Sequence, residues 1–120
     1  MIRILIADDN EFVRRGVAAL LSDAENVEVC GEAADSQQTL KKACELKPDI
    51  VLLDVSMPDR NGLETARLLR DKVPEAKILI LSQHDPASLR DAAAQAGAAG
   101  CLDKARVGAE LLPAIQKLSN

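Results

Sequence analysis

The chain has 120 residues, of which 48% are hydrophobic and 28% are charged, and its formal net charge is −4. A chain of this length can bury a core of its own as one domain. Its acidic balance and its lack of Trp and Tyr argue against nucleic-acid binding by this segment, because a basic surface and base-stacking rings are both missing. Its apolar runs are too short to span a membrane, and its first residues do not form a signal peptide.

The cysteines, Cys30, Cys44 and Cys101, are odd in number and lack the spacing of a zinc site or a disulfide framework. We therefore expect all of them to be small buried apolar residues in a reducing environment. The sequence predicts a cytoplasmic protein without membrane contact.

Strand and helix patterns alternate along the first half of the chain. A strand at residues 2–7 precedes a helix at residues 11–23, and a second strand at 27–33 precedes a helix at 36–46. Pro48 ends this second helix. At helical spacing, the two helices carry apolar stripes made of Val13, Val17, Leu20, Leu21 and Ala24 and of Leu40, Ala43 and Cys44.

The same alternation continues in the second half. A third strand at residues 50–53 ends at Asp54, and Asn61 can cap the helix that follows it. A fourth strand at 77–82 precedes a helix that begins at Asp85-Pro86 and ends at Gly97.

A short fifth strand at residues 99–102 precedes a last helix, whose apolar positions are Val107, Leu111, Ile115 and Leu118. Pro113 interrupts this pattern, because its ring would clash with the carbonyl of Ala109, so we expect the helix to begin late or to bend in its first turn. Five strands that alternate with helices predict an α/β fold, with a parallel sheet covered on both faces.

Charged or hydroxyl side chains follow four of the predicted strands: Asp8, Asp9, Asp54, Ser82 and Lys104. The carboxyl ends of parallel strands share one edge of the sheet, where open α/β sheets bind ligands. Three carboxylates that crowd together in ionised form need a cation. Each residue alone also has a simpler interpretation, as a helix cap, a turn residue or a solvated charge, but their coincidence at the same strand ends favours a metal-assisted site for an anionic group.

The chemistry of phosphoryl transfer fits these residue types. Asp9 and Asp54 can supply oxygen ligands to Mg²⁺, with Asp8 acting directly or through water and a backbone carbonyl after Asp54 as a further ligand. A carboxylate can also attack phosphorus to give an aspartyl phosphate, and the Lys104 ammonium and the Ser82 hydroxyl can stabilise the phosphoryl oxygens. The central position of Asp54 in chain order favours it as the nucleophile.

The chain closely resembles the bacterial response-regulator receiver domain of the CheY-like superfamily. The resemblance rests on the five residues above and on the stretches Ile4-Leu5-Ile6-Ala7-Asp8-Asp9-Asn10, Asp54-Val55-Ser56-Met57-Pro58-Asp59-Arg60-Asn61-Gly62-Leu63-Glu64 and Ala96-Gly97-Ala98-Ala99-Gly100. Within the family, the NarL/LuxR-type transcriptional branch is most similar, on the basis of Arg14-Arg15-Gly16, Gly31-Glu32-Ala33 and Leu81-Ser82-Gln83-His84-Asp85.

This resemblance implies a flavodoxin-like, doubly wound fold with five helices and a parallel sheet in the strand order 2-1-3-4-5, in which residues 1–120 form a single receiver domain. A helix-turn-helix domain usually follows the receiver in that branch, so we expect either that such a domain is absent from this chain or that the receiver stands alone. DNA would be contacted only through that further domain, and phosphorylation would favour a homodimer or another effector output that regulates transcription.

The resemblance also implies residue roles. Asp54 would accept a phosphoryl group from a sensor histidine kinase, and Asp8, Asp9, Asp54 and the carbonyl of Ser56 would hold Mg²⁺. Ser82 and Lys104 would bind the phosphoryl group, and the side chains of Ser56 and His84 would set its lifetime. The chain would then modify only itself, and it would not be an enzyme that turns over an external substrate.

One position departs from the family. The residue three before the lysine is commonly Tyr or Phe, which turns inward on phosphorylation, but here it is Cys101. Either Ser82 and its loop still move and Cys101 leaves the surface more permissive, or phosphorylation is uncoupled or uses another face, such as the first and last helices. A redox role for Cys101 has only the nearby Lys104 in its favour. His84 either positions water or a metal, or is a loop residue at the rim of the site.

Other function classes fit less well. Haloacid-dehalogenase-type phosphatases need a second Asp two residues after the nucleophile, where this chain has Ser56. A flavodoxin-like cofactor site is disfavoured because Asp8-Asp9 would repel a phosphate. An interaction module with the receiver fold but without use of phosphorylation stays the alternative.

Overall fold

The structure is a computed structural model, which describes residues 1–83 and 86–119. Its five strands are β1 (Ile2–Ala7), β2 (Val27–Ala33), β3 (Ile50–Asp54), β4 (Lys77–Ser82) and β5 (Gly100–Asp103). All of them pair in parallel, in the order β2-β1-β3-β4-β5. The predicted parallel sheet and its strand order are therefore confirmed.

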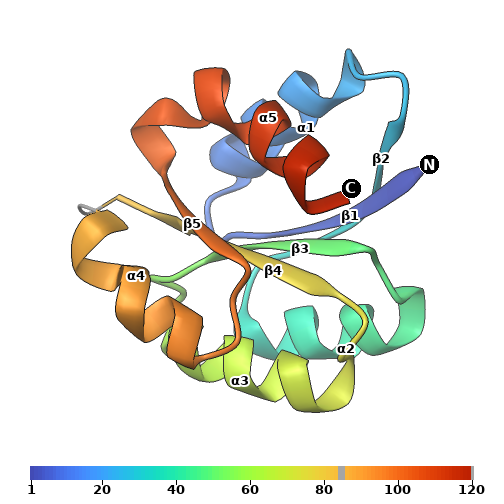
Figure 1. The fold of residues 1–120 in the computed structure, drawn as a ribbon. Coiled ribbons are helices and arrows are strands. Elements are labelled where there is room, and N and C mark those ends of the chain that lie inside the picture. Colours follow the sequence, from blue (N-terminus) through green and yellow to red (C-terminus); the bar gives the residue numbers. More distant parts are fainter. Residues whose placement is uncertain (84–85, 120) are drawn as a thin grey trace.

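Helices cover both faces of the sheet (Figure 1). They are α1 (Glu11–Ser22), α2 (Ser36–Leu46), α3 (Gly62–Lys72), α4 (Pro86–Gln95) and α5 (Val107–Ser119), and a 3₁₀ turn, η1 (Lys104–Arg106), leads into α5. Helices α1 and α5 lie on one face, and α2, α3 and α4 lie on the other. This arrangement is the doubly wound α/β fold that the alternation of strands and helices predicts.

The central strand β3 is buried along its whole length, and it contributes to both halves of the core. Leu52 packs with the residues of α1 and α5, including Leu21 and Leu111, whereas Leu53 packs with those of α2, α3 and α4, including Leu69. Fully burying one such side chain contributes about 2 kcal/mol. The two apolar layers hold the carboxyl ends of β1, β3, β4 and β5 in register at one edge of the sheet.

Asn10 caps the first helix, and the acids before it do not. Its side-chain oxygen accepts from the backbone N–H groups of Phe12 and Val13. The simpler interpretation of Asp8 or Asp9 as the cap of this helix is therefore wrong, and both side chains stay available for another role. Asn61 caps α3 as predicted, by accepting from the N–H of Leu63. Asp85, the predicted cap of α4, lies outside the described residues.

Helix α5 begins at Val107 and continues through Pro113. The expected late start is therefore wrong. Both Pro113 and Ala109, whose carbonyl the ring would meet, are exposed. A carbonyl on the solvent side of a helix can tilt toward water, which explains why the proline does not end the helix.

The cysteines have different environments. Cys101 is buried as predicted, but Cys30 is only half-buried and Cys44 is exposed. The buried face of α2 is instead formed by Ser36, Thr39 and Ala43. Two of these residues are polar, so the sequence did not indicate that they are buried. Their burial is possible because their hydroxyl groups have partners inside the fold: the Ser36 Oγ lies 2.6 Å from the Thr65 Oγ1, and Thr39 donates to a backbone carbonyl.

Candidate functional site

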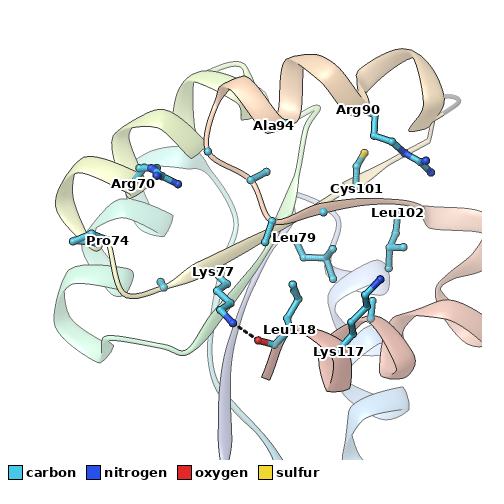
Figure 2. Close-up of a pocket in the computed structure, with 16 residues that line it drawn as sticks. Arg70, Pro74, Lys77, Leu79, Arg90, Ala94, Cys101, Leu102, Lys117 and Leu118 are labelled. Carbon is cyan, nitrogen blue, oxygen red and sulfur yellow. Dashed lines mark hydrogen bonds between the residues drawn. The ribbon is translucent and has the colours of Figure 1, made fainter. Parts of the chain in front are cut away.

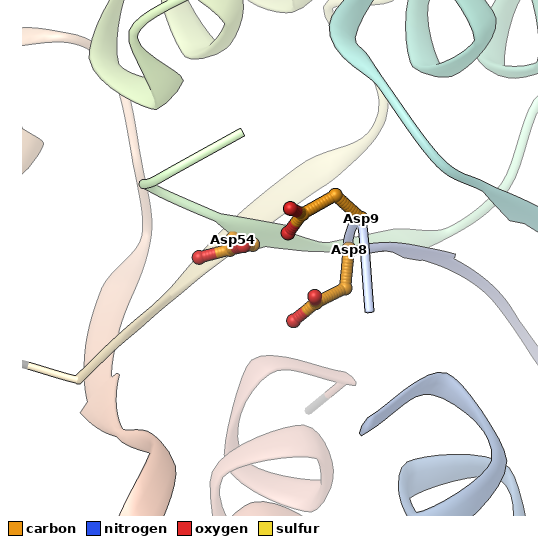
Figure 3. A group of neighbouring side chains, drawn as sticks. All are labelled: Asp8, Asp9 and Asp54. Atoms are coloured by element: carbon orange, nitrogen blue, oxygen red, sulfur yellow. The ribbon is translucent and has the colours of Figure 1, made fainter. Parts of the chain in front are cut away.

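Three carboxylates meet at the carboxyl-end edge of the sheet (Figure 3). Asp8 and Asp9 form the turn after β1, and Asp54 is the last residue of β3. One oxygen from each carboxylate lies within 4.8 Å of the others. Asp8 and Asp54 are buried, with 1% and 2% of their surface exposed, whereas Asp9 is open to solvent. The parallel sheet brings together acids that lie more than forty residues apart in the chain.

Lys104 completes this group from the start of η1, directly after β5. Its Nζ lies 2.7 Å from Asp8 Oδ2 and 3.1 Å from Asp54 Oδ1, and its side chain is only 13% exposed. The simpler interpretation of Lys104 as a solvated surface charge is therefore wrong. Its ammonium bridges the two buried acids, and from this position it can also contact an anion bound at Asp54.

Backbone N–H groups orient the two buried carboxylates. The N–H of Asn10 donates to Asp8 Oδ1 at 2.9 Å, and the N–H of Ser56 donates to Asp54 Oδ1 at 3.0 Å. The N–H of Val55 donates to the Leu81 carbonyl of β4. These local turns fix the direction in which each carboxylate leaves its strand.

The next helix packs directly against this edge through a glycine. A Cβ atom at Gly62, the first residue of α3, would lie 2.4 Å from the Cα of Val55 and 2.9 Å from the Asp54 carbonyl oxygen. The Gly62 N–H also donates to the Val55 carbonyl at 3.0 Å. Only a residue without a side chain allows this approach, so Gly62 holds the segment after Asp54 in place.

The electrostatics of the group are unbalanced. Burial raises the pKa of Asp54 above its usual value, and the charge of Asp8 raises it further, against the lowering by the Ser56 N–H and by Lys104. Burial by itself lowers the pKa of Lys104, but the hydrogen bond to Asp8 and the charge of Asp54 outweigh it, so the pKa of Lys104 is raised. The ammonium therefore stays protonated at neutral pH. Its single positive charge does not neutralise the three carboxylates around it.

The donor set fits a hard divalent cation. Three carboxylates against one ammonium leave two negative charges, and all the available ligand atoms are oxygens, which Mg²⁺ prefers. Asp8 Oδ2 is fully buried, and it lies 2.7 Å from the Lys104 ammonium, which can satisfy only one of the lone pairs of this oxygen. A buried oxygen of this kind has a lone pair left for a cation.

The remaining predicted site residues are placed as follows. Ser82 is buried at the end of β4, one residue beyond the pairing of Asp54 with Leu81. Ser56 is exposed in the loop after β3. His84 lies outside the described residues. The roles assigned to these residues stay predictions.

Asp59 is a residue of this edge whose contacts sequence reasoning missed. Its two carboxylate oxygens accept from the N–H groups of Ser36 and Gln37, at 2.9 and 3.2 Å, so it ties the loop after β3 to the first turn of α2. The Ser36 N–H is the main reason why the pKa of Asp59 lies below its usual value. No local signal could have revealed this contact, because the residues lie more than twenty positions apart.

Cys101 belongs to a different region, a hollow of about 790 Å³ beside β4 and β5 (Figure 2). Its charged lining residues are Arg70, Lys77, Arg90 and Lys117, and none of its lining residues in the described chain is acidic. Burial raises the pKa of the Cys101 thiol, against a smaller lowering by Arg90. The thiol is thus poorly suited to form a reactive thiolate, which weakens the redox interpretation.

The family of the chain follows from a match to the response regulator receiver domain, which extends over residues 4–116. The chain belongs to this family. Receiver domains generally bind Mg²⁺ at an acidic pocket, and the carboxylates of Asp8, Asp9 and Asp54 form a pocket of this kind. A receiver domain of a response regulator is not an enzyme that turns over an external substrate.

Related proteins place this receiver domain in the NarL/LuxR branch. It is 42% identical over 118 residues to the response regulator GacA of Pseudomonas viridiflava, covering 97% of this chain and 54% of that protein. It is 41% identical over 104 residues to the transcriptional regulatory protein LnrK of Bacillus subtilis, covering 87% of this chain and 47% of that protein. The solved receiver domain of the putative response regulator NarL from Mycobacterium tuberculosis is 34% identical, with a TM-score of 0.90, covering 97% of this chain and 94% of that one.

The receiver domain spans about half the length of the curated relatives it matches. Among the helices of residues 1–83 and 86–119, we find none that is both long and apolar enough to cross a membrane.

Proposed function

We propose that this receiver domain accepts a phosphoryl group on Asp54 from a phosphohistidine of a sensor histidine kinase, in a Mg²⁺-dependent reaction. The observation that carries the proposal is the position of Lys104, whose ammonium bridges the buried carboxylates of Asp8 and Asp54 beside the exposed Asp9. Response regulators receive phosphoryl groups from histidine kinases, and this geometry suits that reaction because a nucleophilic carboxylate, a fixed cation and metal-binding oxygens lie together.

Asp54 would act through the carboxylate oxygen that its neighbours leave accessible. Oδ1 lies 3.1 Å from Lys104 Nζ and accepts from the Ser56 N–H, so we assign the attack to Oδ2. The new bond would form between Oδ2 and phosphorus while the bond between phosphorus and the histidine nitrogen breaks. The phosphohistidine ring, protonated on its other nitrogen, keeps that electron pair and leaves as a neutral imidazole.

The other residues would bind the phosphoryl group. Lys104 would contact a phosphoryl oxygen, and its raised pKa keeps it charged throughout. The Ser82 hydroxyl would donate to another phosphoryl oxygen, and the side chains of Ser56 and His84 would tune how fast the aspartyl phosphate hydrolyses.

Magnesium would be held by Asp8, Asp9, Asp54 and the carbonyl of Ser56, and when bound it would neutralise negative charge on the transferring group. The oxygen-only donor set and its excess of two negative charges support this assignment.

The output of the domain is proposed by comparison with its relatives. Phosphorylation would favour a homodimer and change the activity of a transcription regulator in the cytoplasm, as the name of LnrK, a transcriptional regulatory protein, suggests. DNA would be contacted through a helix-turn-helix domain outside residues 1–120, which themselves form a single receiver domain.

Intact-mass spectrometry after incubation with acetyl phosphate and MgCl₂ tests this function. The wild type should gain one phosphoryl mass, which hydroxylamine removes because acyl phosphates react with it. Asp54→Asn should gain nothing, whereas Asp23→Asn, which changes an exposed acid after α1, should behave as the wild type. Equal phosphorylation of the Asp54→Asn protein, or none of the wild type, would refute the proposal.

A further inference from the structure

Arg14 holds the backbone of the turn that carries two of the three acids. Its Nη1 donates to the Asp8 carbonyl oxygen at 2.6 Å, and its Nε lies 3.0 Å from Glu32 Oε1. Although Arg14 comes from α1, its side chain is only 16% exposed. A guanidinium with so little contact with water needs defined partners, and here the partners are Glu32 of β2 and Asp8, which directly follows β1.

The carbonyl that Arg14 binds belongs to the peptide between Asp8 and Asp9. The orientation of this peptide sets the direction in which both carboxylates leave the chain. On the other side of Asp8, its N–H donates to the Ala33 carbonyl of β2 at 3.0 Å. The sheet therefore fixes one side of Asp8, and Arg14 fixes the other.

Glu32 makes this support electrically neutral. A lone cation beside the acids would repel a divalent metal ion, but the Glu32 carboxylate offsets the charge of Arg14. The planar guanidinium can contact the Asp8 carbonyl and Glu32 at once, through different nitrogens. A lysine at this position would keep the charge but would lose the fixed fork of donors.

We infer that Arg14, together with Glu32, is a positioning residue that arranges the Asp8 and Asp9 carboxylates for a divalent cation. This inference rests on the proposed function, since it assigns the metal to these acids. Residues that orient metal ligands typically contribute a factor of 10 to 100 in metal affinity. Because Arg14 acts on the backbone between the ligands, we expect a factor of about 10.

The test measures the dissociation constant of Mn²⁺, a paramagnetic substitute for Mg²⁺, from the electron paramagnetic resonance signal of the free ion. Arg14→Lys should weaken Mn²⁺ binding about tenfold. The matched control is Arg15→Lys, because Arg15 is the next residue of α1, is 68% exposed and pairs with Glu11 at 2.7 Å. We expect this control to bind Mn²⁺ within about twofold of the wild type.

A kinetic measurement separates positioning from a general structural role. Phosphorylation by acetyl phosphate is followed as a function of Mg²⁺ concentration. In Arg14→Lys the half-saturating Mg²⁺ concentration should rise about tenfold, while the rate at saturating Mg²⁺ stays close to the wild type. Glu32→Gln should change in the same direction, because it exposes the charge of Arg14 and frees its side chain.

The possible outcomes are distinct. A wild-type dissociation constant in Arg14→Lys, or equal weakening in Arg15→Lys, overturns this inference alone. A lower rate at saturating Mg²⁺ with unchanged half-saturation also overturns it, because that pattern indicates a structural defect. Wild-type protein that binds no Mn²⁺, or whose binding survives Asp9→Asn and Asp54→Asn together, overturns the proposed function and this inference with it.

Discussion

The carboxyl-end edge of the sheet and the hollow beside β4 and β5 hold charge in opposite ways. At the carboxyl-end edge, Asp8, Asp54 and Lys104 are buried or nearly so and lie within ion-pair distance of each other. In the hollow beside β4 and β5, Arg90 and Lys117 are exposed, and no ion pair with the described residues is found for either. Both regions are strongly charged, but in the first the charges are buried and paired with each other, whereas no cation of the hollow forms an ion pair with the described residues.

This difference separates a reaction site from a charged surface. Removing a charge from water is costly unless it gains partners with good geometry, so buried charges are found where many elements converge to supply those partners. An exposed lysine or arginine has no such requirement and samples many rotamers. Four predictions test this contrast, and they run from the largest expected effect to the smallest.

Lys104→Met should have the largest effect on stability. Removing one partner of a buried ion pair costs about 3–5 kcal/mol, and because Lys104 keeps some contact with solvent we expect a loss of about 2–3 kcal/mol in metal-free protein. Saturating Mg²⁺ should recover part of the loss, since a metal ion also neutralises the acids. The measurement is urea unfolding followed by circular dichroism.

The control is Lys117→Met in the hollow, which should change the free energy of unfolding by less than about 0.5 kcal/mol. If both variants lose the same free energy of unfolding, the contrast between the two regions is wrong.

The stabilisation by Lys104 should also depend on pH. Its raised pKa means that the stabilisation is complete below the unfolded value of about 10.4 and is lost as pH rises through the higher folded value.

Gly62→Ala should destabilise the carboxyl-end edge by about 2 kcal/mol, because the new Cβ meets the backbone of Val55, which cannot move aside without shifting β3. In Gly100→Ala, beside the hollow, the new Cβ meets only the Leu79 Cδ1 at 3.0 Å. A side-chain tip can shift, so we expect a loss of less than about 1 kcal/mol. Thermal unfolding of both variants gives the comparison. Equal losses of stability would show that both regions accommodate an added methyl group equally well.

Asp54→Asn should stabilise metal-free protein by about 1 kcal/mol at neutral pH, because it removes one of the crowded carboxylates. The raised pKa of Asp54 means that the native state takes up its proton first as pH falls. Ionised Asp54 therefore costs stability above the folded pKa, and this cost disappears as pH falls toward the unfolded value of about 3.9.

Unfolding free energies of the wild type and Asp54→Asn are measured between about pH 4 and pH 7. The difference between the two proteins should shrink at the acidic end. A constant difference across this range would contradict the raised pKa of Asp54.

Cys101→Tyr should have the smallest effect. An aromatic ring at this position can extend into the hollow of about 790 Å³ beside it, so we expect a change below about 1 kcal/mol in the free energy of unfolding. A loss above about 3 kcal/mol would show that the site is closed to a ring. The oligomeric state of both proteins with and without beryllofluoride shows whether the ring alters the output of the domain.

Much of the fold could be predicted because its signals are local. The β3 segment Ile50–Asp54 is a short apolar run, as expected of a strand buried on both faces. Asn61 and the glycine at position 97, which has a φ of 93°, begin and end helices through their own chemistry, as predicted, whereas Asn10 was not identified as the cap of α1. Cys44 shows the limit, since the spacing places this small residue in the apolar stripe of its helix, but the structure leaves it exposed.

The site was predictable only as a set of candidates. Asp8, Asp9, Asp54 and Lys104 each follow a strand, and parallel pairing is enough to bring them to one edge. Their partners could not be found in the same way. Arg14 binds the Asp8 carbonyl from α1, and Asp59 binds the first turn of α2, and neither contact leaves a periodic or spacing signal in the sequence.

The sequence by itself determined the class of this protein, because strand ends, helix caps and apolar periodicity are set by neighbouring residues. The tertiary structure decided which charges are partners: that Lys104 bridges Asp8 and Asp54, that Glu32 neutralises Arg14, and that Cys101 faces a hollow rimmed by cations. The physical reason is that ion pairing and burial depend on distances through space, and residues far apart along the chain meet only after the sheet has assembled.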